Sequence, residues 1–102
     1  MPPQNLPPQA DLTKIRQDLT ANGTWAHECG ERIRRRRQEK GYSLEAVARA
    51  AGISFVGLSR LETGDRLASD AVKVAVAFVL NVEVSDLWVF PTRDQTVVRL
   101  AS

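Results

Sequence analysis

The stretch from residue 43 to residue 64 constrains this 102-residue chain most, because it has the pattern of two short amphipathic helices meeting at a glycine. It reads SLEAVARAAGISFVGLSRLETG, with apolar residues at helical spacing in each half. Ser43 and Ser54 each supply a hydroxyl that can cap free amides at a helix start. Gly52 and Gly64 suit the left-handed conformation in which helices often end. We therefore predict two consecutive helices joined by a very short turn.

Two helices at a steep angle, linked by a three- or four-residue turn containing glycine, form a helix-turn-helix unit. Such units commonly place their second helix in the major groove of DNA. The sequence thus points to nucleic-acid binding through the helix that follows Gly52.

Composition agrees with one folded domain but does not by itself indicate a partner. The chain is 43% hydrophobic and 25% charged, with a net charge of +2 and an isoelectric point of about 9.1. Six basic residues gather between Arg32 and Lys40. This run either neutralises phosphates or forms a solvated helix face, and the sequence leaves both interpretations open.

The chain contains a single cysteine, Cys29, so an intrachain disulfide is excluded. Its longest apolar run, residues 74–80, is too short to cross a membrane. The first residues lack the basic start and apolar block of a secretory signal. We expect a cytoplasmic protein that does not contact membranes.

The remaining segments are expected to be mainly helical. We predict a disordered Pro/Gln arm over residues 1–10, followed by a short helix from the Asp11 cap to about Ala21 and a long helix capped by Thr24 and ending at residue 39 or 40. After the two-helix unit we predict a helix from the Ser69 cap to about Leu80 and a short helix over residues 84–89. The tail over residues 91–102 is expected either to be frayed or to form a strand with a second copy. The helix over residues 70–80 is apolar on nearly all sides, which favours a subunit interface.

Three segments carry a resemblance to a known family: CGERIRRRRQEKGYSLEAVARAAGIS, LSRLETG and LNVEVSDLW. Over residues 29–88 the chain resembles the Cro/C1-type (XRE-like) helix-turn-helix transcriptional regulators. The resemblance implies an all-α fold: a compact five-helix lambda-repressor-like DNA-binding domain that acts as a dimer, here with an extra N-terminal helix and a short C-terminal tail or strand. The expected domains are an arm and helix over 1–23, the helix-turn-helix domain over 24–90 and a tail over 91–102.

The resemblance also implies roles for individual residues. It places Ser43 and Ser54 at phosphates, Phe55, Val56 and Gly57 at positions that usually read bases, and Arg60, Thr63 and Arg66 on or just past the recognition helix. Leu44, which replaces the glutamine common at the start of the family's second helix, is also assigned to the DNA-binding surface. Arg60 is the expected guanine contact, because its fork matches O6 and N7; the alternative is a surface arginine paired with Glu62 or another acid. Arg37 and Glu62 are expected to form a structural ion pair.

The chain departs from the family at the base-reading positions. Relatives often carry glutamine, serine or threonine where this chain has Phe55, Val56 and Gly57. The two apolar side chains can touch a thymine methyl or, alternatively, form a patch for a protein partner.

No catalytic constellation is recognisable, and His27 with Cys29 makes no credible metal site. We expect a non-enzymatic protein without a cofactor. The predicted function is sequence-specific transcriptional regulation: a homodimeric repressor that binds a palindromic operator in double-stranded DNA. The alternatives are the antitoxin of a toxin–antitoxin pair, or a protein-interaction module that has lost base readout.

Overall fold

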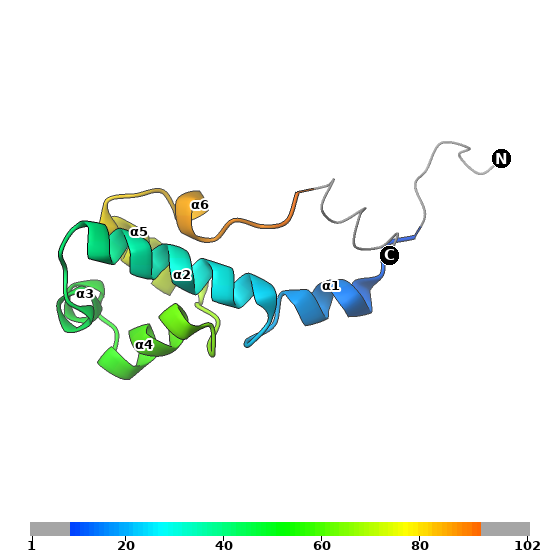
Figure 1. The fold of residues 1–102 in the computed structure, drawn as a ribbon, viewed down its shortest axis with the longest axis horizontal. Helices are drawn as coiled ribbons and strands as arrows, with labels where there is room; N and C mark the ends of the chain where they lie inside the picture. Colours follow the sequence, from blue (N-terminus) through cyan, green and yellow to red (C-terminus); the bar gives the residue numbers. More distant parts are fainter. Residues whose placement is uncertain (1–8, 93–102) are drawn as a thin grey trace.

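The computed structural model describes residues 9–92, and this part of the chain is all-helical. Its six helices are α1 (Leu12–Asp18), α2 (Thr24–Glu39), α3 (Leu44–Ala51), α4 (Phe55–Thr63), α5 (Asp70–Leu80) and α6 (Val84–Leu87). Helix α2 is the longest element, with α4 and α6 packed against it and α3 packed between α4 and α5, while α1 extends beyond the start of α2 (Figure 1). The predicted class, five helices with an additional N-terminal one, is confirmed. Most of the predicted arm, and the strand pattern after residue 95, lie outside the described residues.

Four of the helices begin at side-chain caps that the sequence predicts. Asp11, Ser43, Ser54 and Ser69 each accept a hydrogen bond from the backbone amide three residues later, at 3.1, 3.1, 2.9 and 3.3 Å. Each bond satisfies one of the amides that a helix start leaves unpaired. These caps fix where α1, α3, α4 and α5 begin.

The prediction that Thr24 caps α2 is wrong. Thr24 is the first helical residue, and the capping position belongs to Gly23, whose backbone is extended and which has no side chain to bond. The segment between α1 and α2 is held against the end of α4, because the amide of Asn22 donates to the carbonyl of Gly64 at 2.7 Å. This tertiary bond sets the entry to α2 and also keeps α1 shorter than predicted.

Helix α6 ends at Leu87 rather than at residue 89. The indole Nε1 of Trp25 donates to the carbonyl of Val89 at 2.8 Å, and the rings of Trp25 and Phe90 stack with centroids 4.8 Å apart. These contacts hold the chain after α6 against α2, so the helix does not continue.

The hydrophobic core lies where α2, α4, α5 and α6 meet. Ile33, Leu58, Leu80 and Leu87 are each at most 1% exposed. Full burial of an aliphatic side chain of this size contributes roughly 1.5–3 kcal/mol. The core therefore fixes α4 by its inner face and leaves its outer face to solvent.

A glycine lets α4 approach α2 closely. A Cβ at Gly30 would overlap the carbonyl oxygens of Leu61 and Glu62. Since glycine is the only amino acid without a Cβ, the close crossing of α2 and α4 requires glycine at this position.

The α3–α4 turn has three residues, as predicted. Gly52 adopts a left-handed φ of +74°, and the amide of Ile53 donates to the carbonyl of Ala48 at 3.0 Å. This ending of α3 directs the chain straight into the Ser54 cap of α4. The two helices are thereby held in one fixed arrangement.

Candidate nucleic-acid interface

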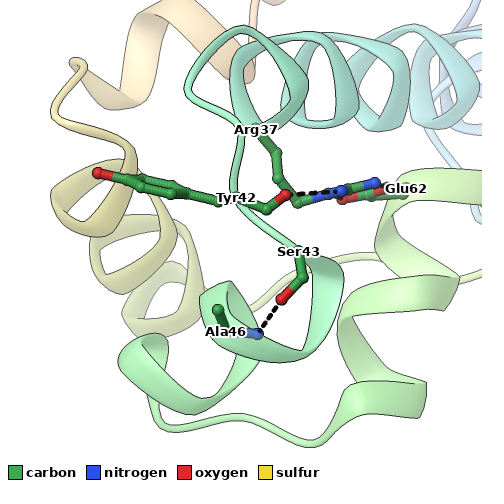
Figure 2. Close-up of polar contacts among 5 residues, drawn as sticks. All are labelled: Arg37, Tyr42, Ser43, Ala46 and Glu62. Atoms are coloured by element: carbon green, nitrogen blue, oxygen red, sulfur yellow. Dashed lines mark hydrogen bonds and ion pairs between the residues drawn. The ribbon is translucent and has the colours of Figure 1, made fainter.

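A buried ion pair ties α2 to α4 beside the α3 loop. Arg37 Nε lies 2.7 Å from Glu62 Oε2 and Arg37 Nη2 lies 3.0 Å from Glu62 Oε1, which makes a two-bond fork. The third nitrogen, Nη1, donates to the carbonyl of Tyr42 at 3.0 Å (Figure 2). Every guanidinium nitrogen of Arg37 is therefore bonded, and one side chain joins three segments of the domain.

The environment of the pair explains its electrostatics. The side chains of Arg37 and Glu62 are only 14% and 8% exposed. The hydrogen bonds to Glu62 raise the pKa of Arg37 above its ordinary value, although burial opposes the shift. Because Glu62 is engaged with Arg37, it does not form the alternative pair with Arg60 that the sequence leaves open.

The first turn of α4 presents apolar side chains to solvent. Phe55 and Val56 are 53% and 54% exposed, although both are large hydrophobic residues. Leu58 and Leu61 lie on the opposite side of the helix and are 0% and 6% exposed. The inner leucines thus orient α4 so that Phe55 and Val56 face outward.

Gly57 does not lie on that outward face. It is buried, and a Cβ built on it would lie 2.9 Å from Ser54 Oγ and 3.6 Å from a guanidinium nitrogen of Arg66. Arg66 belongs to the loop after α4, and its side chain folds back against the start of the helix. The structure therefore places the guanidinium of Arg66 where a residue-57 side chain would otherwise project.

The second half of α4 carries the polar candidates. Arg60 is exposed and forms no ion pair within residues 9–92. The hydroxyl of Thr63 donates to the carbonyl of Arg60 at 3.2 Å and lies 3.0 Å from the Asp65 carboxylate. The Thr63 hydroxyl is thus occupied by its own loop, whereas the Arg60 guanidinium is available to a ligand.

The start of α3 contributes two further predicted site residues. Ser43 is exposed and caps the helix (Figure 2), whereas Leu44 is half-buried and packs against the core. Ser54 occupies the corresponding capping position in α4. Both helices of the unit thus begin at a serine cap, and a helix N-terminus attracts anions.

Sequence reasoning missed two features of this region. The carbonyl of Tyr42 as a partner of Arg37 follows from the path of the α2–α3 loop, and no side-chain pattern signals it. The packing of Arg66 over Gly57 depends on the loop over residues 64–69, although a glycine in the first turn of a helix is a recognisable sign of close approach.

A family model described as "Helix-turn-helix domain" matches residues 28–87, which is more than half of the chain. The chain belongs to the helix-turn-helix domain family. The matched range contains the complete unit of α3 and α4 together with the Arg37–Glu62 pair. The chain is accordingly a DNA-binding protein of the helix-turn-helix regulator type, as its sequence predicts, and not an enzyme.

Individual relatives agree with this helix-turn-helix assignment. The chain is 45% identical over 58 residues to the uncharacterized HTH-type transcriptional regulator YazB of Bacillus subtilis, a match covering 57% of this chain and 84% of YazB. Its fold resembles that of the restriction-modification controller protein C.AhdI from Aeromonas hydrophila, with a TM-score of 0.60, 29% identity and coverage of 61% and 94% of the two chains. It also resembles the clp gene regulator ClgR from C. glutamicum, with a TM-score of 0.58, 25% identity and coverage of 74% and 92%.

Metal-ligating clusters and membrane-spanning helices are both absent from the part of the chain that the structure describes. No group of three or more His, Cys, Asp or Glu side chains between residues 9 and 92 is placed to hold a metal ion. None of the helices in that range is both long and apolar enough to span a membrane.

Proposed function

We propose that this protein is a sequence-specific transcriptional repressor that binds a palindromic operator as a homodimer in the cytoplasm. The observation that supports the proposal best is the orientation of α4, which is fixed by Leu58, Leu61 and the Arg37–Glu62 pair while its outer face stays exposed. A rigid helix with a solvent-facing surface meets the requirement for insertion into the major groove, which is wide enough for one helix.

The proposed DNA contacts follow from the chemistry of the exposed groups. The N-termini of α3 and α4 would lie at phosphates, the outer face of α4 at base edges, and the loop after α4 at the backbone again. The residues assigned to this surface are Ser43, Leu44, Ser54, Phe55, Val56, Gly57, Arg60, Thr63 and Arg66. Gly57 takes part through the space that it leaves for Arg66, and Leu44 through its packing beneath the α3 N-terminus.

The proposed homodimer rests on the outer face of α5. Val74 and Phe78 are four residues apart, so they share one stripe of the helix, and they are 61% and 84% exposed. Phe78 also lines an apolar hollow of about 400 Å³, together with Tyr42, Ala46 and Ala50. A two-fold axis at this patch would set the same apolar surface of each copy against the other, with the projecting rings against the partner's hollow.

Selection of bound sequences from random duplex DNA tests the proposal. We expect a two-fold symmetric consensus with half-sites centred about 34 Å apart, the separation that one helical turn imposes on two recognition helices. Recovery of no consensus, or of one without symmetry, would contradict the palindromic operator.

A second candidate function has a specific observation in its favour. The exposed Phe55 and Val56 would also suit a protein partner, either a toxin or another regulator, with α4 used as a docking helix. Retention of full DNA affinity and sequence preference by an Arg60→Ala variant would count against Arg60 as a base contact, whereas wild-type protein without any sequence preference would favour this protein-interaction module. A toxin gene beside the coding sequence would favour the antitoxin variant of the repressor.

A further inference from the structure

The exposed chemistry of α4 is more restricted than its sequence indicates. Phe55 and Val56 expose about half of their surface, and neither belongs to the side chains packed against the core. They occupy the first two helical positions, at the end of α4 that a helix-turn-helix protein directs toward base edges. Any groove that admits this end of α4 meets two apolar side chains first.

The hydrogen-bonding groups nearby are largely occupied. The Ser54 hydroxyl accepts the Gly57 amide at 2.9 Å, and the Thr63 hydroxyl is held by the Arg60 carbonyl and the Asp65 carboxylate. Gly57 contributes no side chain. Arg60 remains as an exposed donor without an ion pair in the described part of the chain.

One feature of the major groove suits apolar side chains. Thymine carries a 5-methyl group at its groove edge, and the remaining features that distinguish the bases there are hydrogen-bond donors and acceptors. A 5-methylcytosine displays the same methyl group. An apolar side chain gains free energy by covering such a methyl, whereas it leaves a donor or acceptor unsatisfied.

We propose that Phe55 and Val56 read the 5-methyl groups of pyrimidines in the operator, next to the base that Arg60 contacts. This inference rests on the proposed function, because it specifies what the α4 surface recognises in DNA. Preference at these positions would come from methyl burial rather than from hydrogen bonds.

The surroundings of the pair favour DNA over a protein partner. The exposed Arg60 lies one turn further along α4, and the guanidinium of Arg66 lies against the first turn at Gly57. Two apolar side chains between a base-contacting arginine, Arg60, and a phosphate-contacting one, Arg66, match a methyl-bearing base edge that lies beside a guanine and a phosphate. A helix that docks in a protein groove presents apolar anchors at i, i+3, i+4 and i+7, whereas the residues that follow Val56 at this spacing are Ser59, Arg60 and Thr63.

The test replaces thymine by deoxyuridine, which removes the methyl and keeps every base-pairing atom. Fluorescently labelled operator duplexes from the selection would be substituted at one thymine at a time, and affinity would be measured by anisotropy. At one or more positions in each half-site we expect a loss of about fourfold, the equivalent of one buried methyl. Methylated cytosine at the same positions provides the second arm and distinguishes the two sources of the methyl group.

Variants assign the effect to its residues. Phe55→Ala together with Val56→Ala should bind the thymine and uracil duplexes equally, and melting followed by circular dichroism would verify that the fold is intact. The control Arg60→Ala should bind both duplexes more weakly and keep the fourfold ratio between them.

Each outcome decides a different statement. Wild-type protein that binds DNA but does not distinguish a methylated from an unmethylated pyrimidine at any position would overturn the inference alone. Discrimination that survives in the double variant would also overturn it. Wild-type protein that binds no duplex would overturn the proposed function and the inference with it.

Discussion

The buried Arg37–Glu62 pair joins α2 to α4 and helps to fix the position of α4. We predict that Glu62→Ala lowers the free energy of unfolding by about 3 kcal/mol, because it leaves the guanidinium of Arg37 nearly buried without its anionic partner. Chemical denaturation followed by circular dichroism measures this difference.

Glu45 offers a matched control for that variant. It forms an ion pair with Arg49 at 3.6 Å, but both side chains are more than two-thirds exposed. Glu45→Ala should change stability by less than about 0.5 kcal/mol. Equal losses in the two variants would contradict a special role for the buried pair.

Burial of Cys29 makes the free energy of unfolding depend on pH in alkaline solution. Burial raises the pKa of its thiol above the ordinary value of 9.0, although the backbone amide of Val89 and the charge of Arg32 partly offset the shift. In alkaline solution the unfolded chain therefore loses the thiol proton before the folded chain does. Folding stability should be fully present below pH 9 and should fall as the pH rises above it.

Denaturation at a series of pH values measures this effect, with Cys29→Ala as the comparison. The wild-type curve should decline more steeply than the variant curve in alkaline solution. Parallel curves would show that the thiol titrates alike in the folded and unfolded chains.

At the scale of the elements, the start of α4 depends on the loop that follows the helix. Arg66 lies 3.6 Å from where a Cβ on Gly57 would be, which leaves no room for a longer side chain in that direction, whereas a Cβ alone already displaces the Ser54 hydroxyl, only 2.9 Å away. We predict that Gly57→Leu displaces Arg66 and lowers the salt dependence of DNA binding by about 0.9 in log–log slope, the value of one lost phosphate contact.

Gly57→Ala is the control: it shifts the Ser54 hydroxyl, as the leucine also does, but leaves Arg66 in place, so it should retain the wild-type slope. In an Arg66→Ala background, Gly57→Leu should have no additional effect on the slope, because the displaced group is already absent. Additive effects of the two changes would show that residue 57 acts independently of Arg66.

The elements also show what local sequence determines. The caps at Asp11, Ser43, Ser54 and Ser69 are bonds between near neighbours, so the sequence predicts where those helices begin. The end of α6 depends instead on Trp25, more than sixty residues away in the chain, and no local pattern encodes that contact.

At the candidate interface, too, some positions follow from local sequence and others depend on distant contacts. The exposed positions of Phe55, Val56 and Arg60 follow from helical periodicity, because Leu58 and Leu61 must face the core. The burial of Gly57 depends on the path of the loop that brings Arg66 back to α4, which periodicity does not describe.

For the whole molecule, the decisive question is whether two copies associate through α5. We predict that Phe78→Glu converts the proposed dimer into an 11.3 kDa monomer, because a carboxylate would replace the most exposed large apolar side chain of the described range. The same change lowers operator affinity, since each monomer then binds only one half-site. Sedimentation equilibrium measures the association directly.

Phe55→Glu is the corresponding change on α4, where the ring is 53% exposed. It should leave the dimer intact and impair DNA binding alone. A wild-type protein that sediments as a monomer, or a Phe78→Glu variant that remains dimeric, would contradict the assignment of α5 to the interface.

The central claim is that the outer face of α4 enters DNA, and one comparison tests it most directly. Affinity for the selected operator and for a scrambled duplex would be measured for Arg60→Ala and for Arg35→Ala, an exposed arginine of α2. Loss of a guanine contact predicts that Arg60→Ala reduces specific binding by about 1–3 kcal/mol and relaxes the sequence preference, whereas Arg35→Ala affects both duplexes alike. An Arg60→Ala variant with unchanged affinity and unchanged preference would contradict the claim.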